Sequence, residues 1–404
     1  MTQQANGGYL RLAVVLGLIT AVGPFAIDMY LPALPSIGAS LGASAAAVQM
    51  SLMAFFITLG LCQLVYGPLS DMFGRKPPIY VGMALFLAGS VGCALAPNVE
   101  ALIGFRVLQA MGACAGMVVP RAMVRDLYTG SESARLMSLL MLVVSISPIL
   151  APLAGSAIIA ASGWRGVFWA VTAAGVIGLV LAATLLKETR AAEDRGDSSW
   201  GAALSGYRRL LTDGRFMGLT FAGAFGMAAF FVYLSNSSFV LIGHYGLSPT
   251  AYSLFFAANA VSFFGAAQLN GWLAERFGLP AVVRTAAAGF AVAMVAATAV
   301  TAAGVERLEV IAGLLFVGYG FLGLVVPTTA TIAMDDHGEI AGAASALMGA
   351  LQMVTGAAIM ALTGLFADGR PAPMTAGIGA CAVASFIVAQ ATLRPRRLVR
   401  AAAE

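Results

Sequence analysis

Charged side chains are scarce in this sequence. They make up 10% of its 404 residues, whereas hydrophobic residues make up 60%, and the mean hydropathy is +0.90. Soluble globular proteins carry about 25% charged residues, so this composition argues against a soluble domain and indicates a membrane protein with many spans. The net charge of +4 comes from basic residues spread among short segments. They form no single patch, and we expect no nucleic-acid partner.

Cysteine and histidine are also rare. The four cysteines lie within apolar runs, without the spacing of a metal site or of a redox pair. The two histidines, His244 and His337, fall in loops predicted on opposite sides of the membrane. A Gly-rich phosphate loop of the Walker type is absent. We therefore expect no metal, no cofactor and no nucleotide hydrolysis, which leaves a membrane-embedded enzyme or scaffold as the most distant alternative.

Twelve apolar runs are long enough to cross a bilayer, which takes about 20 residues. The first run lacks a cleavage-like end, so we interpret it as a retained span rather than a signal peptide. The sequence predicts an all-α polytopic membrane protein whose transmembrane helices lie at 12–34, 46–66, 77–96, 101–121, 135–160, 165–186, 216–241, 250–274, 281–303, 309–331, 340–365 and 373–392.

The longest gap between these runs, 187–215, begins with a charged stretch. Trp200, Leu204, Tyr207 and Leu211 follow at helical spacing beside two arginines, which predicts a short helix on the inner membrane surface. We therefore divide the chain into three parts: an N-terminal six-helix half at 1–186, a cytoplasmic linker at 187–215 and a C-terminal six-helix half at 216–404.

Basic residues are unevenly distributed between the two sides. If the N-terminus is cytoplasmic, eighteen Lys and Arg residues lie in inner segments and three lie in outer loops. This excess follows the positive-inside rule and predicts that both termini are cytoplasmic. The inner set includes four arginines at the C-terminus: Arg394, Arg396, Arg397 and Arg400.

Two charges remain inside the predicted membrane interior, Asp28 in the first span and Arg106 in the fourth. Asp28 is about 24 Å and Arg106 about 22 Å above the inner surface, at 1.5 Å per helical residue and a core of about 30 Å. We expect Arg106 to offset the charge of Asp28, directly or through water. An intramembrane ionisable residue is a functional candidate by default; a static ion pair that only fixes helix packing is the alternative.

Two segments repeat at about half the chain length. The stretch GPLSDMFG at 67–74 is answered by GWLAERFG at 271–278, and GMVVP at 116–120 by GLVVP at 323–327. Two parallel six-helix halves, each built from inverted repeats, are typical of one large class of transporters. In that class the substrate site lies between the halves, near the bilayer midplane.

Several stretches resemble the major facilitator superfamily. GPLSDMFGRKP at 67–77 resembles its signature between helices 2 and 3, and RVLQAMGA at 106–113 its helix 4 signature. SPILAPLAG at 147–155 is similar to the helix 5 signature of drug antiporters, with Ala151 where glycine is usual. DMYLPALP at 28–35 and DDHGEIAGAASALMGALQ at 335–352 resemble the bicyclomycin/chloramphenicol-resistance (Bcr/CflA) subfamily. The resemblance implies a drug:proton antiporter of the bacterial inner membrane, with Asp28 and Arg106 in proton coupling.

The segment after the second span has a predicted role as a conformational latch. Gly67 and Gly74 would allow a tight turn and close helix approach. Asp71 would face the helix beginning near Gly338, and Arg75 and Lys76 would pair with an acid past the end of helix 4. The alternative is that Arg75 and Lys76 only anchor the helix ends on the cytoplasmic side, as the positive-inside rule describes. The predicted latch consists of Gly67, Asp71, Gly74, Arg75 and Asp126.

Three residues of the fifth span, Pro148, Pro152 and Gly155, predict a bend that seals the interface between the halves. An aromatic wall on the seventh span, with lipid-facing phenylalanines as the alternative, would include Phe225, Phe230, Phe231 and Tyr233. Candidates for a substrate cavity, each of which could instead make only interhelical contacts, are Tyr30, Gln109, Ala113, Phe231, Asn236 and Asn259.

The sequence thus predicts a monomeric exporter that exchanges protons for small amphipathic antimicrobial compounds. In this scheme Asp28 carries the proton, and the proton gradient takes the place of any cofactor. Proton-coupled uptake or export of a metabolite by the same fold is the alternative, and the direction of substrate movement separates the two.

Overall fold

The computed structural model describes residues 2–191, 193–195 and 199–393, all helix, turn or loop in that part of the chain. The four C-terminal arginines Arg394, Arg396, Arg397 and Arg400 lie outside the described residues. The elements are α1 (Thr2–Asp28), η1 (Leu31–Ala33), α2 (Leu34–Leu41), α3 (Ala45–Phe73), α4 (Lys76–Leu95), α5 (Val99–Leu127), α6 (Gly130–Ser162), α7 (Trp164–Leu185), η2 (Glu193–Arg195), α8 (Trp200–Thr212), α9 (Gly214–Ser238), η3 (Phe239–His244), α10 (Pro249–Ala267), α11 (Asn270–Phe277), α12 (Leu279–Ala302), α13 (Leu308–Asp335), η4 (Gly338–Ile340), α14 (Ala341–Gly364) and α15 (Pro371–Thr392).

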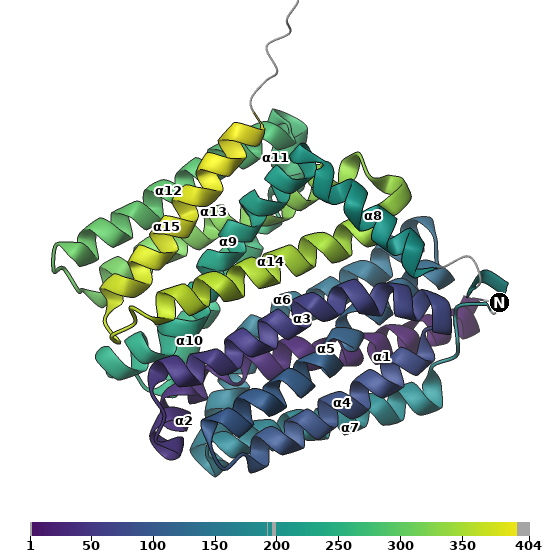
Figure 1. Ribbon diagram of the computed structural model, residues 1–404, viewed down its shortest axis with the longest axis horizontal. Coiled ribbons are helices and arrows are strands. Elements are labelled where there is room, and N and C mark those ends of the chain that lie inside the picture. The colour runs from purple at the N-terminus through teal and green to yellow at the C-terminus, as the bar shows by residue number, and fades with distance from the viewer. Residues whose placement is uncertain (1, 192, 196–198, 394–404) are drawn as a thin grey trace, which may run out of the picture.

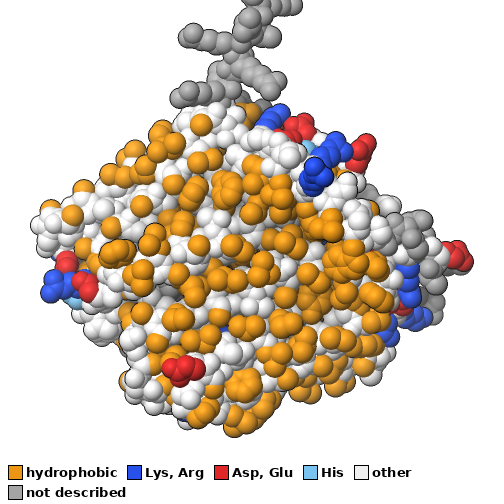
Figure 2. Space-filling model, viewed as in Figure 1, with side chains coloured by type: hydrophobic (Ala, Val, Ile, Leu, Met, Phe, Trp, Pro, Cys, Tyr) orange, Lys and Arg blue, Asp and Glu red, His pale blue; other side chains and the backbone are white. Residues whose placement is uncertain are grey.

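Twelve helical segments of the described chain are long and apolar enough to cross a membrane, which confirms the predicted number of spans. Figure 2 shows the surface that this composition produces: hydrophobic side chains cover the middle of the visible face, while most Lys, Arg, Asp and Glu side chains gather toward its edges. Such an apolar band suits the hydrocarbon core of a bilayer.

The helices form two groups, α1 to α7 and α9 to α15, and α8 runs across the ends of both groups at the right of Figure 1. We call this end of the molecule the α8 end; it also contains the segment 67–76. The other end, where α3 begins and α14 finishes, is called the opposite end. The two groups touch mainly along two helix pairs, α3 with α14 and α6 with α10.

Contacts between the groups are closest in the middle and at the opposite end. Gln49 on α3 donates from Nε2 to the Ser235 carbonyl and to Asn236 Oδ1 on α9, both at 3.1 Å. Ser156 on α6 and Ser253 on α10 share a hydrogen bond of 2.6 Å. At the α8 end the groups separate around a cavity of about 510 Å³.

The first span is not the uninterrupted helix predicted for 12–34. α1 ends at Asp28, a turn follows, and the chain continues through η1 into α2. The residues Pro32 and Pro35 explain the break, because proline lacks the N–H that would continue the ladder of hydrogen bonds and restricts the residue before it. The Met29 and Tyr30 amides bond to the carbonyls of Phe25 and Ile27, which leaves the Ala26 carbonyl for another donor.

The helix predicted from Trp200 onward is confirmed as α8. Its exposed face presents Trp200, Leu204 and Leu211, whereas Tyr207 turns inward and its hydroxyl donates to the Leu64 carbonyl at 3.0 Å. The location of α8 on a membrane surface stays a prediction. The contact with α3 ties the segment between the two groups to the first group of helices.

Candidate functional site

Arg106 lies on α5, fully buried beside the break in the first span. Its Nη1 donates to the Ala26 carbonyl at 3.1 Å and to Gln109 Oε1 at 2.7 Å. The guanidinium also lies over the rings of Phe55 and Tyr30, 4.2 and 4.7 Å from their centroids. The carbonyl end of a helix carries partial negative charge, so the end of α1 and these two rings stabilise the buried cation.

Part of the Arg106 guanidinium is unused. Its Nε and Nη2 atoms are buried without a hydrogen-bond partner. Gln109 is engaged on both sides, since its Nε2 donates to Ser90 Oγ at 2.8 Å. The arrangement leaves Arg106 with donors to spare in a buried position, where an unsatisfied donor costs about 1–3 kcal/mol.

Asp28 is the last residue of α1 and is 5% exposed. Its Oδ2 accepts a hydrogen bond of 2.9 Å from Ser147 Oγ on α6. Within the described chain it forms no ion pair with Arg106. The direct pairing predicted from their similar depth is therefore absent in this structure. The two residues instead meet the same helix break from different sides, Asp28 through α6 and Arg106 through the Ala26 carbonyl.

The helix 5 residues surround this break as well. Pro148 follows Ser147, the donor to Asp28. Gly155 packs against the Met29 backbone so closely that a side chain there would strike the Met29 carbonyl. The Pro152 carbonyl accepts from Ser253 Oγ of α10 at 2.9 Å. One stretch of α6 thus contacts both the turn after Asp28 and the other group of helices; the proposed seal against proton leak stays a prediction.

The segment 67–76 forms a dense ionic network at the α8 end. Arg75 donates to both carboxylate oxygens of Asp126, at 2.7 and 3.0 Å, and also to Asp71 and Ser70. Burial alone would lower the pKa of the Arg75 guanidinium, but the hydrogen bonds and charges of Asp126 and Asp71 raise it above its ordinary value. The predicted contact of Arg75 with Asp126 is confirmed.

Three contacts expected for this segment are absent in this structure, in which the two groups separate at the α8 end, and they stay predictions for a carrier closed there. Asp71 bonds to Arg75 rather than to the start of the helix near Gly338. Lys76 does not reach Asp126, because its ammonium lies over the Tyr80 ring. Gly67 has open space where a side chain would stand, so no close approach requires glycine there. Gly74 does meet its expectation, with φ of 92° in a region that glycine favours.

Glu188, just after α7, is the residue that sequence reasoning missed. Its carboxylate accepts from the Arg75 amide at 2.8 Å and from the Lys76 amide at 3.1 Å, at the start of α4. Burial would raise the pKa of Glu188, but these backbone N–H groups and those of Thr189 and Arg190 outweigh it and hold the pKa below its ordinary value. Glu188 lies directly after a span, beside Lys187 and Arg190, and the sequence does not distinguish it from an ordinary charged loop residue.

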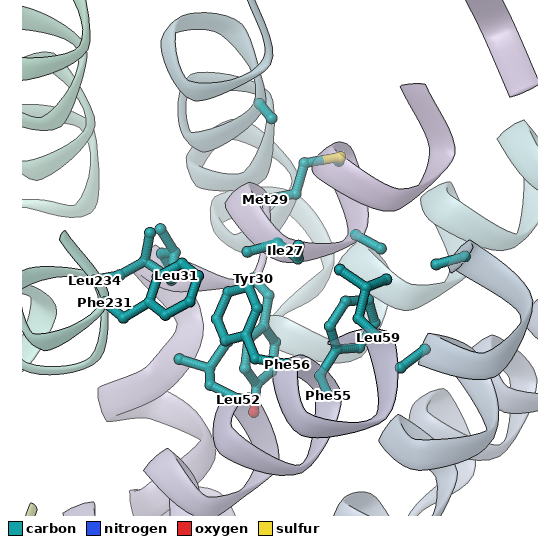
Figure 3. Packing of buried hydrophobic residues seen from close by; sticks show 14 of the residues in the cluster. Ile27, Met29, Tyr30, Leu31, Leu52, Phe55, Phe56, Leu59, Phe231 and Leu234 are labelled. Atoms are coloured by element: carbon teal, nitrogen blue, oxygen red, sulfur yellow. The ribbon is translucent and has the colours of Figure 1, made fainter. Parts of the chain in front are cut away.

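The six substrate-cavity candidates are all buried. Tyr30 shares a hydrogen bond of 2.7 Å with Ser51, and Phe231 stacks on Phe56 with ring centroids 4.2 Å apart, a contact between the two groups that Figure 3 shows. Asn236 accepts from Gln49. Gln109 and Ala113 lie within the first group on α5. These five line neither of two cavities, the large one at the α8 end and a groove of about 280 Å³ between α10 and α13.

Asn259, the sixth candidate, lines that smaller groove and donates to the Tyr233 hydroxyl at 3.0 Å. The aromatic wall expected on the seventh span is partly internal: Phe231 and Tyr233 are buried, and Phe230 packs against Phe256. In this structure these residues make packed contacts with their neighbours. Their role in lining a substrate cavity stays a prediction.

Comparison with known proteins agrees with this architecture. Residues 16–361 match the sequence model of the Major Facilitator Superfamily. The chain is 36% identical over 362 residues to YdgK, an uncharacterised transporter from Bacillus subtilis, covering 88% of this chain and 89% of YdgK. It is 28% identical over 382 residues to the bicyclomycin resistance protein homolog of Haemophilus influenzae, covering 93% and 94%.

A D-xylose-proton symporter of known structure has the same fold, with a TM-score of 0.74 at 15% identity, covering 95% of this chain and 97% of the symporter. The family match extends over most of the sequence, from the first span to the eleventh, and the resemblance drawn from the motifs is thereby confirmed. Twelve spans, two groups of six and the helix 2–3 signature all agree: this chain belongs to the major facilitator superfamily, a family of transporters rather than enzymes.

Proposed function

We propose that the protein exports small amphipathic antimicrobial compounds across the bacterial inner membrane in exchange for protons. The subfamily motifs and the similarity to the bicyclomycin resistance protein homolog of Haemophilus influenzae support an antibiotic as substrate. The positive-inside bias supports a cytoplasmic α8 end, with both termini on that side. The proton gradient supplies the energy, without a cofactor, and one chain is the working unit.

The observation that carries this proposal is the isolation of Asp28. Its carboxyl group is buried with one hydroxyl donor and without a cation. A carboxyl group in such surroundings is most stable when protonated. Two unused donors of Arg106 are available once the proton leaves. The site therefore has two arrangements that differ by one proton, which is the minimum that proton coupling requires.

This arrangement corresponds to one step of the transport cycle. A neutral Asp28 in a carrier whose halves separate at the α8 end corresponds to a proton that entered from outside and awaits release to the cytoplasm. Deprotonation then draws Arg106 toward the carboxylate and readies the carrier for the next drug. A proton and the drug compete for one site in this scheme.

Inverted membrane vesicles test the proposal. With an acidic lumen, an exporter accumulates radiolabelled chloramphenicol inside the vesicles, whereas a proton-coupled importer does not. A susceptibility panel in a pump-deficient strain selects further substrates if chloramphenicol is not transported. Asp28→Asn is expected to insert normally and to lose the pH-driven accumulation. Full accumulation by Asp28→Asn would show that this carboxyl group does not carry the coupling proton.

A further inference from the structure

The cavity at the α8 end is lined by side chains from both groups of helices and from α8. Its N-terminal wall carries Arg121 and Arg125, one turn apart on α5. Arg121 is about 22 Å from Arg106 along the same helix, at 1.5 Å per residue. The cavity is therefore a separate place in the molecule, and the proton-coupling site makes no use of these two arginines.

Both arginines are unengaged. Neither Arg121 nor Arg125 forms a hydrogen bond or an ion pair in the described part of the chain, and the Nε of Arg121 is buried. Gln63, on α3 of the same group of helices, also lines the cavity and likewise has a side-chain amide without a hydrogen bond. Three donor groups thus face one cavity, two of them permanently charged.

Two carboxylates also line the cavity, but both have other partners. Asp71 pairs with Arg75, which is shared with Asp126. Glu339 lies 3.8 Å from Arg209, and its side chain is 89% exposed. Neither carboxylate approaches Arg121 or Arg125 within 4.0 Å, so the positive charge of this wall is not neutralised by the protein.

The rest of the lining suits an apolar group. Val118 and Met137 lie on the side of the arginines, and Met334 and Ile340 lie across from them. A volume of about 510 Å³ is within the range of small-molecule sites, about 300–1,000 Å³. The arginine pair at one wall and apolar side chains around it match a ligand with an anionic head and an apolar body.

A partly buried guanidinium without a partner is costly, and guanidinium groups bind phosphate and carboxylate with charge-assisted hydrogen bonds. We propose that Arg121 and Arg125, with Gln63, form an anion-recognition site for the phosphate or carboxylate group of an amphipathic molecule. The anionic group can come from a lipid headgroup of the adjacent leaflet or from a free amphipathic anion. Both sources present the same chemistry to the arginines.

Binding of hexyl phosphate tests this site. The full-length protein is placed in nanodiscs of phosphatidylcholine, and binding is measured by isothermal titration calorimetry. Arg121→Gln is expected to weaken binding at least tenfold, as the loss of a charge-assisted hydrogen bond implies. Arg208→Gln removes one positive charge from α8, outside the cavity lining, and is the matched control that leaves binding unchanged. Binding is measured without a proton gradient, so failure of the proton-coupling proposal would be seen separately, in the vesicle assay.

Nanodiscs with 30% phosphatidylglycerol distinguish the two sources. If the anionic lipid competes, hexyl phosphate binds more weakly in these nanodiscs and the headgroup is the natural occupant. If binding is unchanged, the free anion is the occupant, and both results support the site. No binding in phosphatidylcholine nanodiscs, or an equal loss in Arg121→Gln and Arg208→Gln, would overturn it and leave the arginines as hydrated anchors.

Discussion

Arg106 donates a hydrogen bond to the carbonyl oxygen of Ala26, two residues before α1 ends at Asp28. The cation on one helix thereby caps the broken end of another, and the coupling carboxyl group lies at the same break. A change at Arg106 is consequently felt by the backbone around Asp28 even though no ion pair joins the two side chains.

Replacing Arg106 with alanine should therefore lower both stability and transport. The Ala26 carbonyl and the Gln109 side chain lose a charged donor, a loss of about 1.5–3 kcal/mol for each such bond. Arg106→Lys keeps the charge without the planar fork, so partial transport is expected. Thermal unfolding in detergent and vesicle transport measure the two effects. Wild-type stability in Arg106→Ala would show that the cap contributes nothing.

The interaction between Asp28 and Arg106 should depend on pH. In a double-mutant cycle of Asp28→Asn and Arg106→Ala, effects on unfolding should be nearly additive at low pH, where Asp28 is neutral and unpaired. At high pH an ionised Asp28 gains the attraction of Arg106, so the coupling energy should grow. A coupling energy that stays constant from pH 5 to pH 9 contradicts the switch.

Gly155→Ala should destabilise the protein by about 1–3 kcal/mol, because the added methyl group strikes the Met29 carbonyl and overpacks a tight contact. Gly104→Ala is the matched control: it also lies within a helix, but nothing is within 4 Å of the added carbon. There, alanine should be neutral or stabilising. Thermal unfolding of the two variants measures the difference. Equal melting temperatures would mean that α6 moves away from the turn at little cost.

Glu188→Gln should loosen the ionic network at the α8 end. The carboxylate accepts through two oxygens, whereas the glutamine amide has only one. One backbone N–H of Arg75 or Lys76 therefore loses its partner, at a cost of about 1 kcal/mol. Because the pKa of folded Glu188 is held below its ordinary value of 4.5, its stabilisation is present above that value. It is lost as pH falls through the lower pKa of the folded state, and the difference between wild type and variant should then vanish. Glu193→Gln, at another acid of the linker, is the control, because the bonds to the Arg75 and Lys76 amides come from Glu188.

Asp71→Asn should reduce turnover more than expression or drug binding. The contact predicted between Asp71 and the helix near Gly338 requires the two groups to close at the α8 end, so its loss should favour the open arrangement described here. Cysteines at Gly67 and Ser345, which line the cavity from α3 and α14, report closure by cross-linking in a background without the native cysteines. The cross-linking yield should fall in Asp71→Asn. An unchanged yield means that Asp71 is only a partner of Arg75.

The number of spans and the helix before the seventh span could be predicted because hydropathy and helical periodicity are local properties of the chain. Arg75 could be matched with Asp126 because Arg75 lies in the helix 2–3 signature and Asp126 lies past the predicted end of helix 4. The break after Asp28 was missed although Pro32 and Pro35 are visible in the sequence, because apolar composition continues through it. The hydrogen bond from Arg106 to the Ala26 carbonyl could not be predicted from the sequence, because that carbonyl lacks a helical partner only where the helix breaks. Glu188 acts on a segment 112 residues away, and neither periodicity nor charge counting reports such contacts.

The contacts that close the opposite end have a thermodynamic consequence. Gln49 with Asn236 and Ser156 with Ser253 join the two groups through amides and hydroxyls, which water can bond equally well once the groups part. Each such bond contributes only about 0.5–1.5 kcal/mol net. A carrier that visits two conformations in every cycle needs them close in free energy, so that binding of one proton or one drug decides between them. Phe56 and Phe231 add an apolar contact between the same two groups, and the hydratable bonds beside it keep the free energy needed to part the groups low.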